Sequence, residues 1–150
     1  MMEVDTMSVP VGEVMSRPVE TVSAQATVAE AAARMRDAGV GFLPVLDGGE
    51  LVGVVTDRDI TIRVTARRLD PTGALVRDAM THEVVACLED QPIHEVASLM
   101  ESTALRRLVV KNAQGTAMGV ISLDDLAELA DEQWRVGSVL GHVVSPSGMA

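Results

Sequence analysis

The sequence predicts a mixed α/β protein made of two copies of a β-α-β-β-α unit. First, an ordered series of short motifs occurs in both halves of the chain. Second, apolar residues at helical spacing alternate with short apolar runs bounded by turn residues. Third, apolar residues make up 47% of the 150 residues and aromatic ones only 1%. The core must therefore consist of Val, Ala, Leu, Ile and Met.

The internal repeat is read from three pairs of segments that keep the same order and nearly the same spacing. One extra residue lies in the turn before the last pair. The paired segments are 14–16 and 79–81, 28–32 and 93–97, and 52–56 and 118–122. The duplication therefore rests on a whole series of motifs.

The first repeat predicts five elements after a short entry segment over 11–16 and a break at Pro18. A brief strand is followed by a helix, which Gly39 is placed to end. A strand hairpin around a Gly-rich turn and a second helix complete the unit. The predicted ranges are 19–22, 28–38, 42–46 and 51–55, with the last helix starting near Thr56.

The second repeat predicts the same elements, with Pro92 in the first turn of its first helix. Its strands are expected at 84–87, 108–110 and 118–121, and its last helix at 123–133. The predicted domains are repeat 1 at 11–68, a linker at 69–76, repeat 2 at 77–133 and a tail at 134–150. Because the linker is short, we expect the two repeats to pack together. The Gly- and Ser-rich tail is either disordered or docked on a partner subunit.

Charge and composition narrow the function. The net charge of −10 disfavours direct nucleic-acid binding, because an acidic chain repels phosphate backbones. The chain has one cysteine, an acidic start without a signal-peptide pattern, and no apolar run of membrane-spanning length. These features predict a cytoplasmic protein with no membrane association.

The most informative motif is apolar-Gly-apolar-apolar-[Thr/Ser]-x-x-Asp, found at 52–59 and again at 118–125. It predicts a strand that runs into the start of a helix. One interpretation is a capping box, in which the hydroxyl and the acid satisfy free N–H groups at the helix start.

A second interpretation assigns the motif to ligand binding. A helix start presents unpaired N–H groups that suit a phosphate. A hydroxyl there can bond a phosphate oxygen, and a carboxylate one turn later can accept from the two hydroxyls of a ribose. The glycine lets either a flat base or a neighbouring strand approach closely. Capping alone requires neither the glycine nor a second copy.

The duplicated pattern resembles the CBS domain pair. The resemblance rests on Met-Ser-Arg-Pro-Val at 15–19, Leu-Pro-Val-Leu-Asp at 43–47 and Gly-Val-Val-Thr-Asp-Arg-Asp-Ile at 53–60, and it covers about residues 11–133. It implies two β-α-β-β-α units joined through their sheets as a pseudo-two-fold pair, often dimerised. It also implies AMP, ADP, ATP or an S-adenosyl compound in the clefts between repeats.

The resemblance also implies roles for individual residues. Asp59 and Asp125 become the ribose-binding carboxylates, and Thr56 and Ser122 become phosphate ligands. Short strands and apolar pairs would line the adenine, namely Thr21, Val22, Val54, Val55, Ala86, Cys87, Val120 and Ile121.

The repeats depart from each other where the family often carries a basic residue, just before the Leu-Pro-Val strand. The second repeat has Arg106 and Arg107 there, whereas the first has Gly41 and Phe42. As phosphate ligands, these two arginines give the second repeat the better claim to the phosphates, and the sequence leaves open which cleft they face. Arg58, inside the first motif, can partly compensate as a phosphate ligand. We therefore expect unequal sites, one of them weak or empty.

No other feature predicts catalysis. The three histidines lack the tight spacing of metal ligands, and Cys87 reads as a small buried apolar residue. The acids of the motifs have no accompanying nucleophile, so we expect no enzyme and no catalytic cofactor. The resemblance implies a homodimeric regulatory module that signals to a separate protein. The alternative is a dimeric assembly protein whose nucleotide sites have degenerated.

Overall fold

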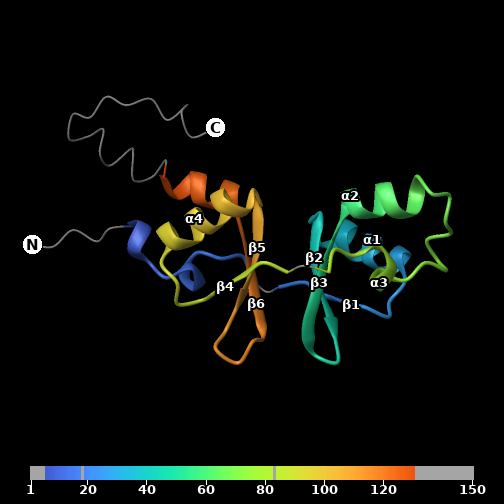
Figure 1. Ribbon diagram of the computed structural model, residues 1–150, viewed down its shortest axis with the longest axis horizontal. Helices are drawn as coiled ribbons and strands as arrows, with labels where there is room; N and C mark the ends of the chain where they lie inside the picture. Colours follow the sequence, from blue (N-terminus) through green and yellow to red (C-terminus); the bar gives the residue numbers. More distant parts are fainter. Residues whose placement is uncertain (1–5, 18, 83, 131–150) are drawn as a thin grey trace, which may run out of the picture. The chain divides into compact units, whose positions relative to one another are not determined.

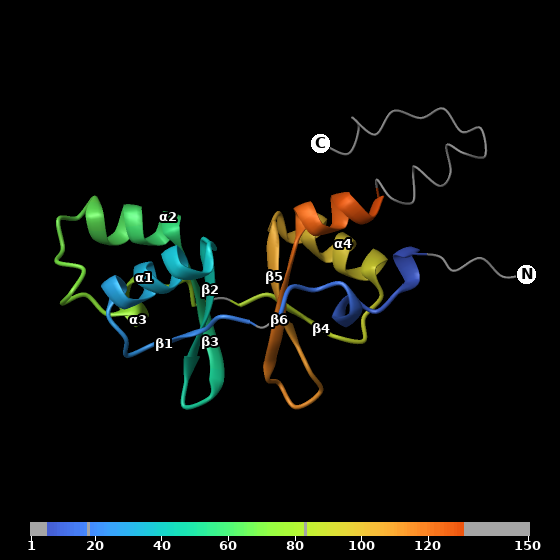
Figure 2. The same cartoon turned by 180° about the vertical axis from the view of Figure 1, so that it is seen from behind.

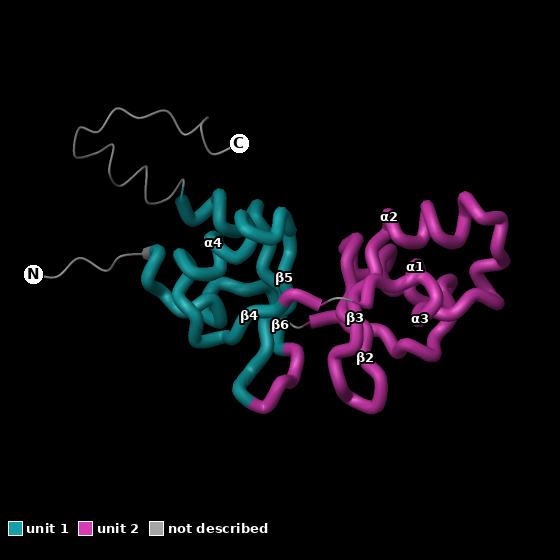
Figure 3. Tube along the Cα trace, viewed as in Figure 1, with its two compact units in different colours: residues 1–17, 86–113, 118–150 teal, residues 18–85, 114–117 magenta. Residues whose placement is uncertain are grey.

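The computed structural model describes residues 6–17, 19–82 and 84–130. The predicted tail therefore lies outside the described residues. The chain forms two compact units, coloured separately in Figure 3. Of the described residues, unit 1 comprises 6–17, 86–113 and 118–130, and unit 2 comprises 19–82, 84–85 and 114–117. In the described parts of the chain, no helix is both long and apolar enough to cross a membrane.

Unit 2 contains a three-stranded sheet in the order β1-β2-β3, with its helices on one side (Figures 1 and 2). Strand β1 pairs with β2 in parallel and β2 pairs with β3 antiparallel. Helix α2 continues as a five-residue π-helical stretch, η3. The elements are β1 (Val22–Ser23), α1 (Val28–Ala38), β2 (Phe42–Asp47), β3 (Glu50–Thr56), α2 (Asp57–Ile60), η3 (Thr61–Thr65) and α3 (Val76–Ala79).

Local chemistry explains where these elements begin and end. The Thr27 hydroxyl accepts a hydrogen bond from the Glu30 N–H and caps α1. Gly39 ends the helix at a φ of 69°, a left-handed conformation that glycine adopts without strain. The predicted helix and hairpin are confirmed in this unit.

Unit 1 repeats the architecture with a sheet in the order β4-β5-β6. Its helices also lie on one side of the sheet (Figures 1 and 2). The elements are η1 (Thr6–Ser8), η2 (Val11–Glu13), β4 (Ala86–Leu88), α4 (Ile93–Thr103), β5 (Arg107–Lys111) and β6 (Ala117–Ser122), and residues 123–130 are helical. Pro92 is the N-cap of α4, one position before the predicted first turn.

The entry segment of each repeat belongs to the unit that holds the other repeat's helices. Val11 donates its N–H to the Gln91 carbonyl in unit 1. Val76, at the equivalent position of the second repeat, donates to the Ala26 carbonyl in unit 2. Val11 and Val76 are fully buried, so each entry segment contributes to the core of the unit it joins.

Three local predictions need correction. The first strands of both repeats begin later than predicted, at Val22 and Ala86, because ladder pairing with β2 and β5 begins only there. The second entry segment forms a short helix, α3, which was not predicted. The π-helical turn after α2 was not predicted either, since Thr61–Thr65 carries no distinguishing pattern.

Candidate functional site

In unit 2 the motif spans the junction between β3 and α2 and forms a complete capping box. The Asp59 N–H donates to the Thr56 Oγ1 at 3.0 Å. The Thr56 N–H donates to the Asp59 Oδ2, also at 3.0 Å. The capping interpretation is therefore correct for this copy.

Unit 1 repeats this geometry where β6 runs into the helix over 123–130. The Asp125 N–H donates to the Ser122 Oγ at 3.0 Å, and the Ser122 N–H donates to the Asp125 Oδ2 at 3.0 Å. Asp59 and Asp125 are both half-buried. The fold thus presents the same hydroxyl and carboxylate twice in one local arrangement.

The capping hydrogen bonds leave some polar atoms of each motif available to bind a ligand. The hydroxyl of Thr56 or Ser122 uses a lone pair in the cap, so its own hydrogen can still be donated. A carboxylate has two oxygens, and within the described residues no hydrogen bond reaches Oδ1 of Asp59 or Asp125. Capping and ligand binding are therefore compatible at the same residues.

The motif glycines make room for a strand. A Cβ on Gly53 would lie 2.6 Å from the Thr81 carbonyl oxygen, and one on Gly119 would lie 2.6 Å from that of Ser16. Val54 and Thr81 exchange two backbone hydrogen bonds of 3.0 and 2.8 Å. Of the two predicted uses of the glycine, close approach by a neighbouring strand is the one realised.

Ser16 and Thr81 lie beside the candidate site, and the sequence reasoning did not single them out. Each follows a methionine, each carries a hydroxyl, and each pairs with the apolar residue after a motif glycine. Ser16 exchanges hydrogen bonds of 2.9 and 3.3 Å with Val120. The repeated Met-[Ser/Thr] pair was the available signal, but only the tertiary fold places it beside the motif strand.

The predicted basic ligands are exposed in both units. Arg58 lies in the first turn of α2, and its N–H donates to the Asp57 Oδ1 at 2.9 Å. Gly41 faces the Asp57 carboxylate, since a Cβ there would lie 2.7 Å from Oδ2. In unit 1, the Arg106 guanidinium lies 3.7 Å from Asp124, and Arg107 begins β5.

The predicted adenine-lining residues divide into three groups. Thr21, Val22, Ala86 and Cys87 lie at or beside β1 and β4, and one strand separates each of these from the motif strand of its unit. Strand spacing makes that about 10 Å. Val55 and Ile121 are fully buried in the core. Val54 and Val120 are half-buried and lie next to the entry segments.

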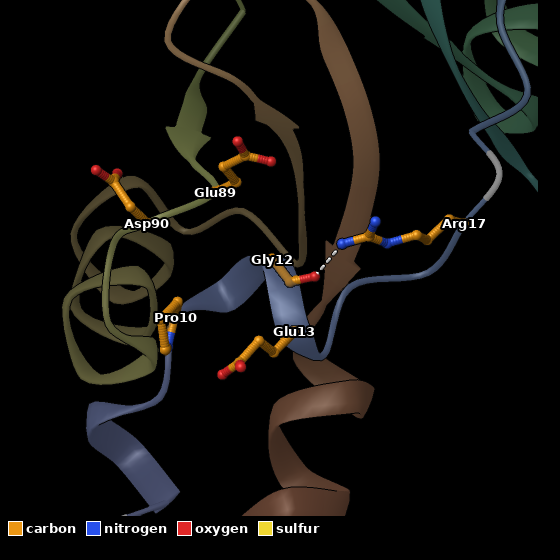
Figure 4. A pocket seen from close by; sticks show the side chains of 6 residues that line it. All are labelled: Pro10, Gly12, Glu13, Arg17, Glu89 and Asp90. Carbon is orange, nitrogen blue, oxygen red and sulfur yellow. Dashed lines mark hydrogen bonds between the residues drawn. The ribbon is translucent and has the colours of Figure 1, made fainter.

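Unit 1 contains two cavities, and one of them is lined by a candidate site residue. One, of about 240 Å³, is lined by Val14, Asp125, Glu128 and Leu129 and so contains a predicted ribose ligand. The other, of about 600 Å³, contains no predicted residue. It is lined by Pro10, Gly12, Glu13, Arg17, Glu89 and Asp90, and Figure 4 shows Arg17 donating to the Gly12 carbonyl.

Cys87 is buried beside β5, with its Sγ 3.8 Å from the Val109 carbonyl. Burial raises the pKa of this thiol to about 11, because the thiolate is poorly solvated there. Over the described residues, no group of three His, Cys, Asp or Glu side chains is arranged to hold a metal ion.

Comparison with known proteins places the duplicated motif in a family. The CBS domain model matches residues 11–65 and 76–132. The uncharacterized protein YlbB of Bacillus subtilis is 39% identical over 134 residues, covering 87% of this chain and 88% of that protein. MK0525 of Methanopyrus kandleri, also uncharacterized, is 32% identical over 81% of this chain, which spans 63% of that protein.

A solved structure of similar fold contains a nucleotide. The CBS domain protein PAE2072 of Pyrobaculum aerophilum, complexed with AMP, matches with a TM-score of 0.72 and 28% identity. The match covers 82% of this chain and 99% of that one.

Proposed function

Because this chain belongs to the CBS domain family, as two tandem copies of that domain, we propose that it is a non-catalytic regulatory module that binds an adenosine-type ligand. The ligand is AMP, ADP, ATP or an S-adenosyl compound. The AMP complex of PAE2072 supports this ligand class.

In the proposed binding mode, the Oδ1 atoms of Asp59 and Asp125 accept from the hydroxyls of the ribose. The Thr56 and Ser122 hydroxyls donate to the 5′ phosphate. Arg58 adds a positive charge beside the unit 2 site. The capping boxes support this mode because they hold each carboxylate and hydroxyl in position before a ligand arrives.

The adenine is proposed to contact Val54 and Val120, together with the entry segments that pair with them. These two valines replace their neighbours Val55 and Ile121 in the proposal, because the latter are fully buried. The strongest support for this binding mode is the unit 1 cavity, where Asp125 lies beside the apolar side chains of Val14 and Leu129. A carboxylate beside apolar side chains suits a sugar joined to a flat base.

Ligand binding would act by stabilising one arrangement of the chain over another, and a separate protein would respond to the change. We propose a homodimer in the cytoplasm as the working form.

The test is calorimetric titration of AMP, ADP, ATP and S-adenosylmethionine into wild type, Asp59→Asn and Asp125→Asn. Asparagine keeps one acceptor oxygen for the cap, but its amide group cannot accept from a ribose hydroxyl. We expect each substitution to abolish binding at its own site. A ligand at a hundred times its Kd should also stabilise wild type by about 2.7 kcal/mol.

Thr27→Ala is the matched control, because it removes a capping hydroxyl from α1 without altering either motif. It should lower stability by about 1 kcal/mol and leave ligand affinity unchanged. If none of the four compounds binds wild type, the adenosine-ligand function is wrong, and the assembly-protein alternative takes its place.

A further inference from the structure

Arg63 and Leu129 stand at equivalent positions in the two units. Arg63 lies four residues beyond the proposed ribose carboxylate of unit 2, Asp59, and Leu129 lies four residues beyond that of unit 1, Asp125. Residues four apart in a helix are neighbours on one face, so each of these side chains lies one turn from its carboxylate. A group bound beside the carboxylate therefore meets an arginine in unit 2 and a leucine in unit 1.

In unit 2 the Arg63 side chain connects its helix to the entry segment. The guanidinium Nη1 donates to the Ala79 carbonyl at 3.0 Å and to the Met80 carbonyl at 2.7 Å. Hydrogen bonds from a charged donor are stronger than those between neutral groups. Ala79 and Met80 are only 1% and 5% exposed. The arginine therefore occupies the space between η3 and the end of α3.

Unit 1 has a hollow at the corresponding place. Val14 is the counterpart of Ala79, and it lines the cavity of about 240 Å³ together with Leu129 and Asp125. Val14 is half-buried, whereas Ala79 is almost fully buried. Among the described residues, no donor reaches the Val14 carbonyl. Because a leucine side chain cannot hydrogen-bond to a carbonyl, the space that the arginine occupies in unit 2 stays open in unit 1.

We propose that Arg63 blocks the unit 2 site, so that the adenosine ligand binds in unit 1, where Leu129 leaves the space free. The inference rests on the proposed function, because it places the ribose in the cavity beside Asp125. A ligand in unit 2 must break both hydrogen bonds of Arg63, whereas a ligand in unit 1 enters a space that already exists. Losing two such bonds corresponds to an affinity lower by roughly tenfold or more. Arg63 is thus a specificity-determining residue that distinguishes two matching capping boxes.

The test exchanges the two side chains and titrates AMP, ADP, ATP and S-adenosylmethionine into the full chain. In wild type, Asp125→Asn should abolish the tighter binding event and Asp59→Asn should leave it unchanged. Arg63→Leu, added to the Asp125→Asn chain, should tighten binding in unit 2 by about tenfold. Leu129→Arg, added to the Asp59→Asn chain, should weaken binding in unit 1 by about tenfold.

The sign of these changes separates blocking from electrostatic attraction. For AMP, ADP and ATP, removing the Arg63 cation would by charge alone weaken binding, and adding a cation in place of Leu129 would strengthen it. Both effects are opposite to those that blocking predicts. Arg36→Leu is the control, because it removes an exposed arginine from α1, and it should leave every affinity unchanged.

Several outcomes would overturn the inference alone. They are equal affinities of the two sites in wild type, tighter binding in unit 2 than in unit 1, or a Leu129→Arg chain that binds as tightly as its Asp59→Asn parent. If Arg63→Leu does not fold, the Leu129→Arg comparison decides the inference. Failure of all four compounds to bind wild type overturns the proposed function and the inference with it.

Discussion

Replacing Gly119 with alanine tests how each entry segment is held in place. The new Cβ would lie 2.6 Å from the Ser16 carbonyl oxygen and 2.7 Å from the Met15 Sδ. An ordinary contact is nearer 3.5 Å, so the segment must move by about 1 Å. That shift strains the two backbone hydrogen bonds between Ser16 and Val120.

The expected loss is about 3 kcal/mol in the free energy of unfolding. Overpacking against backbone contributes roughly 1–3 kcal/mol, and each weakened hydrogen bond about 1 kcal/mol. Urea unfolding followed by far-ultraviolet circular dichroism should show a midpoint lower by about 1–2 M. Glu-C protease should also cleave after Glu13 faster than in wild type, because this entry segment is less firmly docked.

Gly73→Ala is the control, since a Cβ there would meet only the Asp70 carbonyl at 3.8 Å. Its free energy of unfolding should stay within about 0.5 kcal/mol of the wild-type value. Gly53→Ala should behave like Gly119→Ala but accelerate tryptic cleavage after Arg77, in the other entry segment. If Gly119→Ala is as stable as Gly73→Ala, the close approach at the motif glycine does not hold the entry segment.

Three further predictions follow from local geometry. Ala104 ends α4 at a φ of 57°, so Ala104→Gly should raise the free energy of unfolding by about 0.5–1 kcal/mol. Gly39→Ala, at the equivalent position after α1, should lower it. Effects of the same sign in both variants would contradict this reasoning. Arg63 donates to two carbonyls at the end of α3, at 3.0 and 2.7 Å, so Arg63→Met should cost about 1–2 kcal/mol in thermal unfolding, and the exposed Arg36→Met almost nothing. The raised pKa of Cys87 means that the folded chain keeps its thiol proton longer, so stability should fall as pH rises from about 9 to about 11. Cys87→Val should remove that fall, and an identical pH profile in the variant would refute the assignment.

Much of the fold could be predicted from sequence because its signals are local. The helical spacing that starts at Val28, the glycine that ends the helix and the hairpin around Gly48 and Gly49 depend on neighbouring residues alone. The capping boxes are equally local, since Thr56 and Asp59 are three residues apart. Residue spacing therefore sufficed to predict both motifs and their junctions between strand and helix.

The remaining parts of the site depend on contacts between residues far apart in the chain. Nothing near Met15 or Met80 in sequence indicates which glycine each segment will pack against. That choice follows from backbone pairing across the fold and from the space that Gly53 and Gly119 leave. The burial of Val55 beside the half-exposed Val54 is likewise set by which face of β3 the helices cover.

The sequence by itself determined the duplication, the family and the paired hydroxyl and carboxylate, because each depends on short motifs whose residues lie close together in the chain. Only the tertiary structure decided that the entry segments exchange between units and that Arg106 pairs with Asp124. It alone placed Val14 at the cavity of Asp125. The physical reason is that packing and pairing between distant segments depend on shape and hydrogen bonding in three dimensions, which residue spacing does not encode.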